Sequence, residues 1–171
     1  FFFLFNIGRG TNSKMTIGAW VQTNTLTGLH KIIGSDDGGG DRTLGLDSRG
    51  NNFSSGFGDR YSAFTGFDNT AAGGLVETPV GTFAPTGTGA NDWSFVAVVY
   101  DQGASSATVY ADIDASTTGD ALVSFNKNPT AVGSGFSTTA IGGLRPDNAN
   151  DPWDGKIDNV FFFNTGLTGA Q

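Results

Sequence analysis

The sequence predicts an all-β fold, either a β-sandwich or a jelly roll. The chain has 171 residues, of which 27 are glycine, and this composition suits short strands joined by tight turns. Several segments alternate apolar and polar residues, which is the period of a half-buried strand. No window shows a sustained helical period with caps. The length suits one domain, which we expect to span residues 1–171.

The first half of the chain contains four predicted strands. In "MTIGAWVQT" (15–23), Met15, Ile17 and Ala19 alternate with polar residues and glycine. Trp20, and Trp93 further along, are expected in or near the core because of their positions in strands. The remaining predicted strands of this half cover 30–35, 42–47 and 52–58.

The second half contains the clearest hairpin, formed by "DWSFVAVVYD" (92–101) and "SATVYADI" (106–113) around a short Gly-containing turn. Two further strands are predicted at 139–144 and 155–164. The stretch 65–91 is rich in Gly, Thr, Ala and Pro, and we expect a long loop there with one or two short strands.

Composition excludes several classes of function. The formal charge is −7 and the basic residues are scattered, whereas a nucleic-acid footprint needs clustered Lys and Arg. No apolar run approaches the roughly 20 residues of a membrane helix. The chain lacks cysteine and an initiator Met. We therefore expect a processed product or fragment of a longer exported protein, located outside the cell or at its surface, with no nucleic-acid partner and no membrane insertion.

The order of several motifs resembles that of laminin-G-like, concanavalin-A-like jelly-roll domains of the lectin/glucanase superfamily. These motifs are "MTIGAWVQT", "KIIGS", "RTLGLD", "WSFVAVVYD…ATVYAD", "IGG" and "DGKIDNVFFFNTGLTGAQ". The resemblance covers roughly residues 15 to 171. It implies two antiparallel sheets packed face to face, with the first and last strands as neighbours. Members of such a family include carbohydrate-binding modules, adhesion domains and structural spacers, so the fold does not fix the function.

The acidic residues argue against catalysis. Retaining glycosidases on this type of sandwich carry paired glutamates, but the chain has a single glutamate, Glu77. One histidine, His30, and no cysteine also remove the usual nucleophilic triads. The sequence therefore predicts a protein that is not an enzyme.

Calcium is the cofactor that the acidic loops could hold, in a structural role. Asp36, Asp37 and Asp41 lie on a glycine-rich loop, and carboxylates and carbonyls are the ligands of Ca²⁺. The alternative is that these residues only form turns. Asp158 is predicted on the same inward face as Val160 and Phe162. There it would bond backbone amides, contact a basic side chain or ligate calcium.

Carbohydrate binding is predicted at a loop rim around Trp153. An aromatic platform with polar neighbours is the usual form of a sugar site, and the neighbours here are Asp147, Asn150 and Asp151, with Asp154 close by. The alternative is that Trp153 plugs the end of the sandwich. Arg60 and Tyr61 form a second candidate for this role.

The phenylalanines predict an interface. If Val160 and Phe162 face inward, Phe161 and Phe163 face outward, and an apolar patch of this kind is seldom left uncovered. A loop of the same chain such as 65–91, a neighbouring domain or another copy would cover it. The N-terminal "FFFLFNI" is also apolar, and Phe1, Phe3 and Phe5 would extend the patch if the terminal strands pair.

Two hypotheses follow from these features. The first is a non-catalytic recognition or adhesion domain that binds a glycan or another surface component, such as a surface protein, at its loop rim. The second is a structural subunit that self-assembles into a homo-oligomer, filament or surface layer through its aromatic face and terminal strands.

Overall fold

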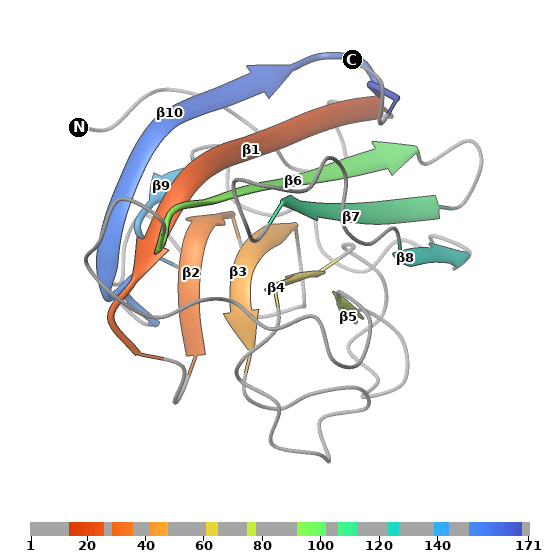
Figure 1. Cartoon of the computed structure of the whole chain (residues 1–171). Helices are drawn as coiled ribbons and strands as arrows, with labels where there is room; N and C mark the ends of the chain where they lie inside the picture. Colours follow the sequence, from red (N-terminus) through yellow and green to blue (C-terminus); the bar gives the residue numbers. More distant parts are fainter. Residues whose placement is uncertain are drawn as a thin grey trace.

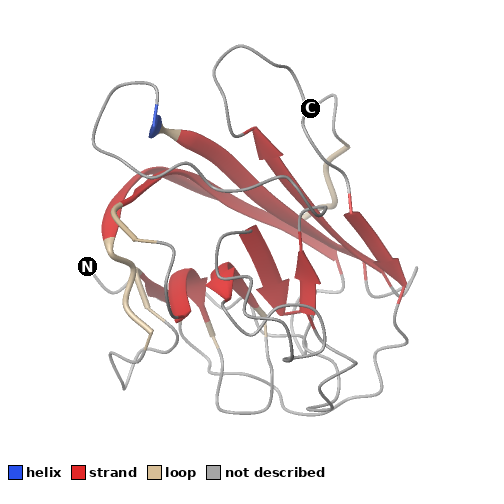
Figure 2. Cartoon of the chain, turned by 60° about the horizontal axis from the view of Figure 1, so that its bottom comes forward, coloured by secondary structure: helices blue, strands red, loops and turns tan. Residues whose placement is uncertain are grey.

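The computed structural model shows a two-layer β-sandwich, which confirms the predicted fold class (Figure 1). The structure describes residues 14–25, 29–35, 42–47, 61–64, 75–77, 92–101, 106–112, 123–126, 139–143 and 151–168. These residues form ten strands and contain no α-helix. Figure 2 shows the strands of the two sheets as separate layers. No helix in this part of the chain is long and apolar enough to span a membrane.

Sheet A contains the first and last described strands as neighbours, in the order β10-β1-β6-β7-β8. Its strands are β1 (Lys14–Thr23), β6 (Ser94–Asp101), β7 (Ser106–Asp112), β8 (Val123–Asn126) and β10 (Gly155–Phe163). β1 pairs antiparallel with β10 on one side and with β6 on the other. β6 and β7 form the predicted hairpin. The pairing of the terminal strands is therefore confirmed for β1 and β10.

Sheet B lies opposite and has the order β5-β4-β3-β2-β9. Its strands are β2 (Leu29–Gly34), β3 (Thr43–Asp47), β4 (Tyr61–Phe64), β5 (Leu75–Glu77) and β9 (Ala140–Ile141). β9 is much shorter than the predicted 139–144. The predicted strand at 52–58 lies outside the described residues.

The core lies between the two sheets. Aliphatic residues from both sheets fill it, with Met15, Ile17 and Val98 from sheet A opposite Leu44 and Leu46 from sheet B, all almost completely buried. Burial of this apolar surface supplies the main stabilising free energy.

Polar groups also cross the sandwich. The Tyr100 hydroxyl donates to the Thr43 carbonyl at 3.2 Å. The buried Arg42 guanidinium lies 4.7 Å from the centroid of the Tyr100 ring and donates to the Met15 sulfur at 3.3 Å. This cation–π contact offsets part of the cost of burying the charge.

A β-bulge in β10 overturns the prediction that Asp158 faces inward. The register passes from Gly18↔Phe161 to Trp20↔Asp158, so Asn159 and Val160 together oppose one residue of β1. Asn159 has a φ of 49°, in the left-handed region that Asn tolerates. The extra residue shifts the alternation, so Ile157 and Val160 both pack against the core while Asp158 is exposed. The period of two failed because it assumed an uninterrupted strand.

Candidate functional site

Four aromatic side chains form a continuous row across the outer surface of sheet A. We call Trp20, Phe95, Phe161 and Phe163 the aromatic face; they come from β1, β6 and β10. Trp20 meets Phe95 edge to face at 5.6 Å between centroids, Phe95 stacks on Phe161 at 5.7 Å, and Phe161 contacts Phe163 at 5.6 Å. Such contacts hold each ring in a defined orientation. The row is therefore an ordered surface.

The exposed ends of this row are Trp20 and Phe163, with 36% and 45% of their surface accessible. The outward orientation predicted for Phe161 and Phe163 is confirmed. Val160 and Phe162, which alternate with them along β10, pack against the core, and the Phe161 and Phe163 rings contact each other on the outer surface. Trp20 was predicted in or near the core, and this is wrong. Its neighbours Ala19 and Val21 point inward and are fully buried, so the alternation of β1 directs Trp20 to solvent.

Gly18 makes room for the row. A Cβ atom at this position would overlap the Phe161 ring and lie 2.6 Å from the Val96 carbonyl oxygen. The absence of a side chain lets Phe161 lie across β1 and reach Phe95 on the far strand. Glycine in the middle of a strand often marks such a close approach.

Residues 164–168, which follow β10 and which we call the C-terminal turn, lie against one end of the outer surface of sheet A. The Thr16 hydroxyl donates to the Thr165 carbonyl at 2.8 Å and accepts from the Leu167 amide at 2.9 Å. Gly166 lies so close to Val99 that an added Cβ would be 3.3 Å from it. Thr16 is consequently buried, although the alternation of β1 directs it outward. Trp20, at the other end, and Phe163, which pairs with Thr16, are both exposed.

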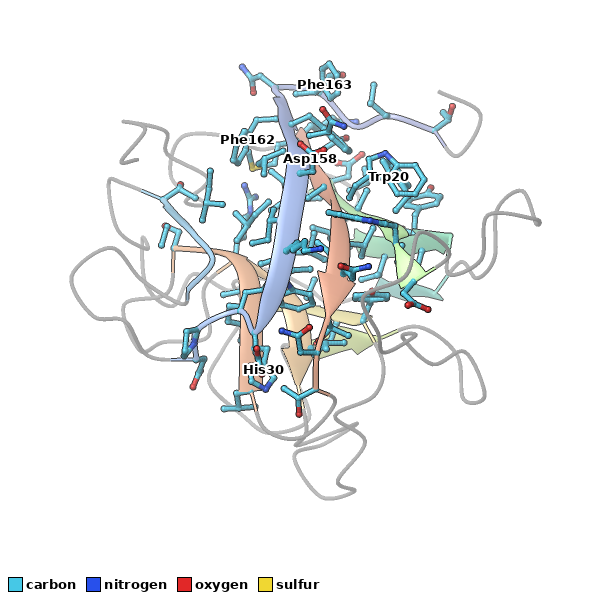
Figure 3. The ribbon with its side chains drawn as sticks, turned by 60° about the vertical axis from the view of Figure 1, so that its left-hand side comes forward. Trp20, His30, Asp158, Phe162 and Phe163 are labelled. Atoms are coloured by element: carbon cyan, nitrogen blue, oxygen red, sulfur yellow. The ribbon has the colours of Figure 1, made fainter. Side chains whose placement is uncertain are left out.

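Asp158 lies at the Trp20 end of this surface. It pairs with Trp20 across the β1–β10 ladder, and directly opposed residues have Cβ atoms about 4.5–5.5 Å apart. One carboxylate oxygen accepts from the Asn159 amide at 2.8 Å, which fixes the carboxylate. Lys156 is exposed two residues earlier on the same face of β10. Figure 3 shows Trp20 and Asp158 on the adjacent strands, with His30 near the opposite end of the view.

The rim around Trp153 is built differently from the sugar platform that the sequence suggested. The indole is half-buried against the core, and its Nε1–H lies 3.2 Å from the carbonyl oxygens of Gln22 and Lys156. These contacts agree with the alternative that Trp153 closes the end of the sandwich. Asp151 has a φ of 52°, and its backbone carbonyl accepts a hydrogen bond from the Lys31 backbone N–H at 2.9 Å. The ligand-binding role of both residues stays a prediction.

Polar side chains of this rim form hydrogen bonds within the rim, one to another side chain and one to the backbone. The Asn24 amide nitrogen donates to the Asp154 carboxylate at 3.0 Å, and His30 Nδ1 lies 2.8 Å from the Pro152 carbonyl oxygen. Tyr61, the second aromatic candidate for sugar binding, is almost completely buried in the core. It therefore cannot form a surface platform, and that suggestion is wrong.

Several predicted site residues lie outside the described part of the chain. These are Asp36, Asp37 and Asp41 of the proposed calcium loop, Asp147 and Asn150 of the rim, and Phe1, Phe3 and Phe5 of the interface. Within the described residues, no group of three or more His, Asp or Glu side chains is arranged to hold a metal ion. Phe95 and Lys156 were not identified from the sequence. Recognising them requires knowing that β1 lies between β6 and β10.

A family model described as the concanavalin A-like lectin/glucanases superfamily matches residues 5–171. The chain belongs to this superfamily. No curated protein sequence matches it. The resemblance noted from the motifs is therefore confirmed, and it extends over nearly the whole chain.

Solved structures share the fold of this concanavalin A-like chain at low sequence identity. A Bacteroides ovatus protein named as a candidate carbohydrate-binding protein has a TM-score of 0.62 and 18% identity, over 93% of this chain and 39% of that one. The CBM40 of the Ruminococcus gnavus IT-sialidase has a TM-score of 0.58 and 14% identity, over 92% and 79%. The NanB sialidase of Streptococcus pneumoniae has a TM-score of 0.60 and 14% identity, over 92% and 23%.

Within this concanavalin A-like sandwich, the exposed aromatic and charged groups of sheet A meet at Trp20. Phe95 supports the indole from the β6 side, and Asp158 lies beside it on the β10 side. The arrangement joins an apolar ring to a hydrogen-bond acceptor and, at Lys156, to a donor. These are the groups with which a protein surface binds a ligand that has both apolar and polar faces.

Proposed function

We propose that this chain is a non-catalytic recognition domain of an exported or cell-surface protein, and that it binds carbohydrate. The observation that carries the proposal is the exposed indole of Trp20 beside the exposed carboxylate of Asp158 on a concanavalin A-like sandwich. The names of two of the similar structures refer to carbohydrate binding or to a carbohydrate-binding module of a sialidase, which supports the same class of ligand.

The absence of catalysis is part of the proposal. A retaining glycosidase site needs two carboxylates facing one cleft, and glutamates usually supply them on this fold. The chain contains one glutamate, at the end of the short strand β5. The intended test is hydrolysis of a panel of oligosaccharides, and release of reducing sugar above the buffer control would contradict this part.

A glycan array tests the binding function directly. The whole chain is applied with calcium and again with EDTA. We expect saturable binding of the protein to a subset of glycans. If no glycan binds the protein above background, the proposed function is overturned. Dependence on calcium would support a structural Ca²⁺ at Asp36, Asp37 and Asp41, because carboxylate-rich loops bind this cation.

Self-assembly through the aromatic face is the second candidate function. The exposure of Phe163 favours it, because large apolar side chains at the end of an aromatic row add to a contiguous apolar surface. Light scattering over a wide concentration range tests this candidate. A monomer at the highest concentration would contradict it, whereas a dimer that Phe163→Ser abolishes would support it.

A further inference from the structure

We infer that the exposed end of the aromatic face is a subsite for one uncharged pyranose ring, with Trp20 as its platform. The inference rests on the proposed function and specifies where the sugar lies and what class it belongs to. It moves the site from the loop rim around Trp153 to the outer surface of sheet A.

The Trp20 ring is both accessible and held in place. About a third of its surface is exposed, and Phe95 packs against it edge to face at 5.6 Å. The face of an aromatic ring carries negative electrostatic potential, so it attracts the positively polarised C–H groups of a sugar ring. A platform that is ordered before binding loses little conformational entropy when the ligand arrives. Trp153 is half-buried, with its indole packed against the core.

Asp158 supplies a fixed acceptor at the edge of that platform. The bulge at Asn159 directs the carboxylate to the outer surface opposite Trp20, and bulges often re-aim a side chain in this way. The backbone N–H of Asn159 donates a hydrogen bond to one carboxylate oxygen of Asp158 at 2.8 Å. No described residue donates to the other oxygen, which can accept from sugar hydroxyls. Lys156 lies about 7 Å away along the same face of β10 and offers a donor.

The platform is bordered by Phe161 on the side that leads to Thr16. Phe161 lies across Gly18 and stacks on Phe95. Beyond it, the C-terminal turn is bonded to Thr16. A sugar chain would therefore leave the platform toward Lys156 or past Phe95.

Charge favours uncharged sugars over acidic ones. Asp158 places a negative charge beside the platform, and the whole chain carries a formal charge of −7. A sialic acid carboxylate at this position would lie well within the roughly 8–10 Å Debye length of Asp158. Lys156 offsets only part of this repulsion because it pairs with Gln22, whereas Asp158 pairs directly with Trp20. We therefore expect this subsite to bind an uncharged sugar more tightly than sialic acid.

The test measures the affinity of the whole chain for lactose, cellobiose and sialyllactose by titration calorimetry. We expect wild-type protein to bind at least one neutral disaccharide about tenfold more tightly than sialyllactose, a difference of about 1.4 kcal/mol. Trp20→Ala should reduce that affinity about tenfold or more, and Trp20→Phe should restore part of it. Asp158→Asn should weaken neutral-sugar binding, because it replaces an acceptor oxygen with a donor NH2 group. It should also reduce the difference in affinity between the neutral disaccharide and sialyllactose, because it removes the negative charge.

Phe163→Ser is the matched control. It removes an exposed ring from the same aromatic face but at the end remote from Asp158, so it should leave affinity within about twofold. Circular dichroism and melting temperature confirm that each variant is folded. Unchanged affinity in folded Trp20→Ala, with the wild type binding sugar, would overturn the subsite but not the proposed function. A preference for sialyllactose would overturn the assignment to uncharged sugars. Absence of sugar binding by the wild type would overturn both proposals.

Discussion

Asn159 controls what the outer surface of sheet A presents. Its φ of 49° places the extra residue of the bulge in β10. The shift lets Ile157, Val160 and Phe162 all pack against the core. The same shift brings Asp158 out to the surface beside Trp20. One backbone conformation therefore satisfies the core and builds the polar edge of the proposed subsite.

The conformation of Asn159 leads to a prediction about stability. A β-branched residue pays a steric penalty in the left-handed region, so Asn159→Val should lower the free energy of unfolding by about 1–2 kcal/mol. Asn159→Gly should have a small effect, because glycine adopts this region freely. Urea denaturation of the two variants measures the difference. If Asn159→Val is as stable as Asn159→Gly, the bulge is not held by this conformation.

The same residue shows the limit of sequence-based reasoning at this scale. The outward positions of Phe161 and Phe163 could be predicted, because the side chains of residues 160–163 point alternately to the core and to the outer surface. The position of Asp158 could not, because the sequence "IDNV" has no glycine or proline that signals a bulge. Only the tolerance of Asn for positive φ hinted at it. The role of Trp20 needed the additional knowledge that it pairs with Asp158.

At the scale of the elements, β1 holds the outer surface together. It pairs with β10 and β6, and Thr16 binds the C-terminal turn through both hydrogen bonds of its hydroxyl. This turn covers Thr16 and lies against Val99, while Phe163 stays exposed. The long strands with clear alternation, β1, β6, β7 and β10, were all predicted from the sequence. The short strands β4 and β8 were not, because four residues give too little alternation to detect.

Replacement of Thr16 should release the C-terminal turn. Thr16→Val keeps the shape of the side chain but leaves the Leu167 amide and the Thr165 carbonyl without this partner. We expect a loss of about 1–3 kcal/mol in the free energy of unfolding. Amide hydrogen exchange at Leu167 should also accelerate, since its donor is no longer bonded. Thr16→Ser, which retains the hydroxyl, is the control. Equal protection of Leu167 in both variants would contradict the proposed tie.

At the scale of the whole molecule, a buried tyrosine from each sheet links stability to pH. Tyr61 belongs to β4 in sheet B and Tyr100 to β6 in sheet A, and both are almost completely buried. Burial raises the pKa of Tyr61 and of Tyr100 well above the ordinary value, and the Arg42 charge offsets only part of this at Tyr100. The folded protein therefore keeps both phenols neutral at a pH where the unfolded chain ionises them.

This difference predicts a loss of stability at high pH. Below the unfolded-state pKa of about 10, the phenols are protonated in both the folded and the unfolded state. The two tyrosines therefore do not change the free energy of unfolding with pH in that range. Above it only the unfolded state releases protons, and the free energy of unfolding should fall by up to about 1.4 kcal/mol per pH unit for each tyrosine. Urea denaturation between pH 9 and about 11.5 measures the slope. The double variant Tyr61→Phe/Tyr100→Phe should show a much smaller slope, because phenylalanine has no proton to release. If the slope in the double variant equals that of the wild type, other groups cause the alkaline unfolding. The two phenols then make no contribution to the pH dependence of stability.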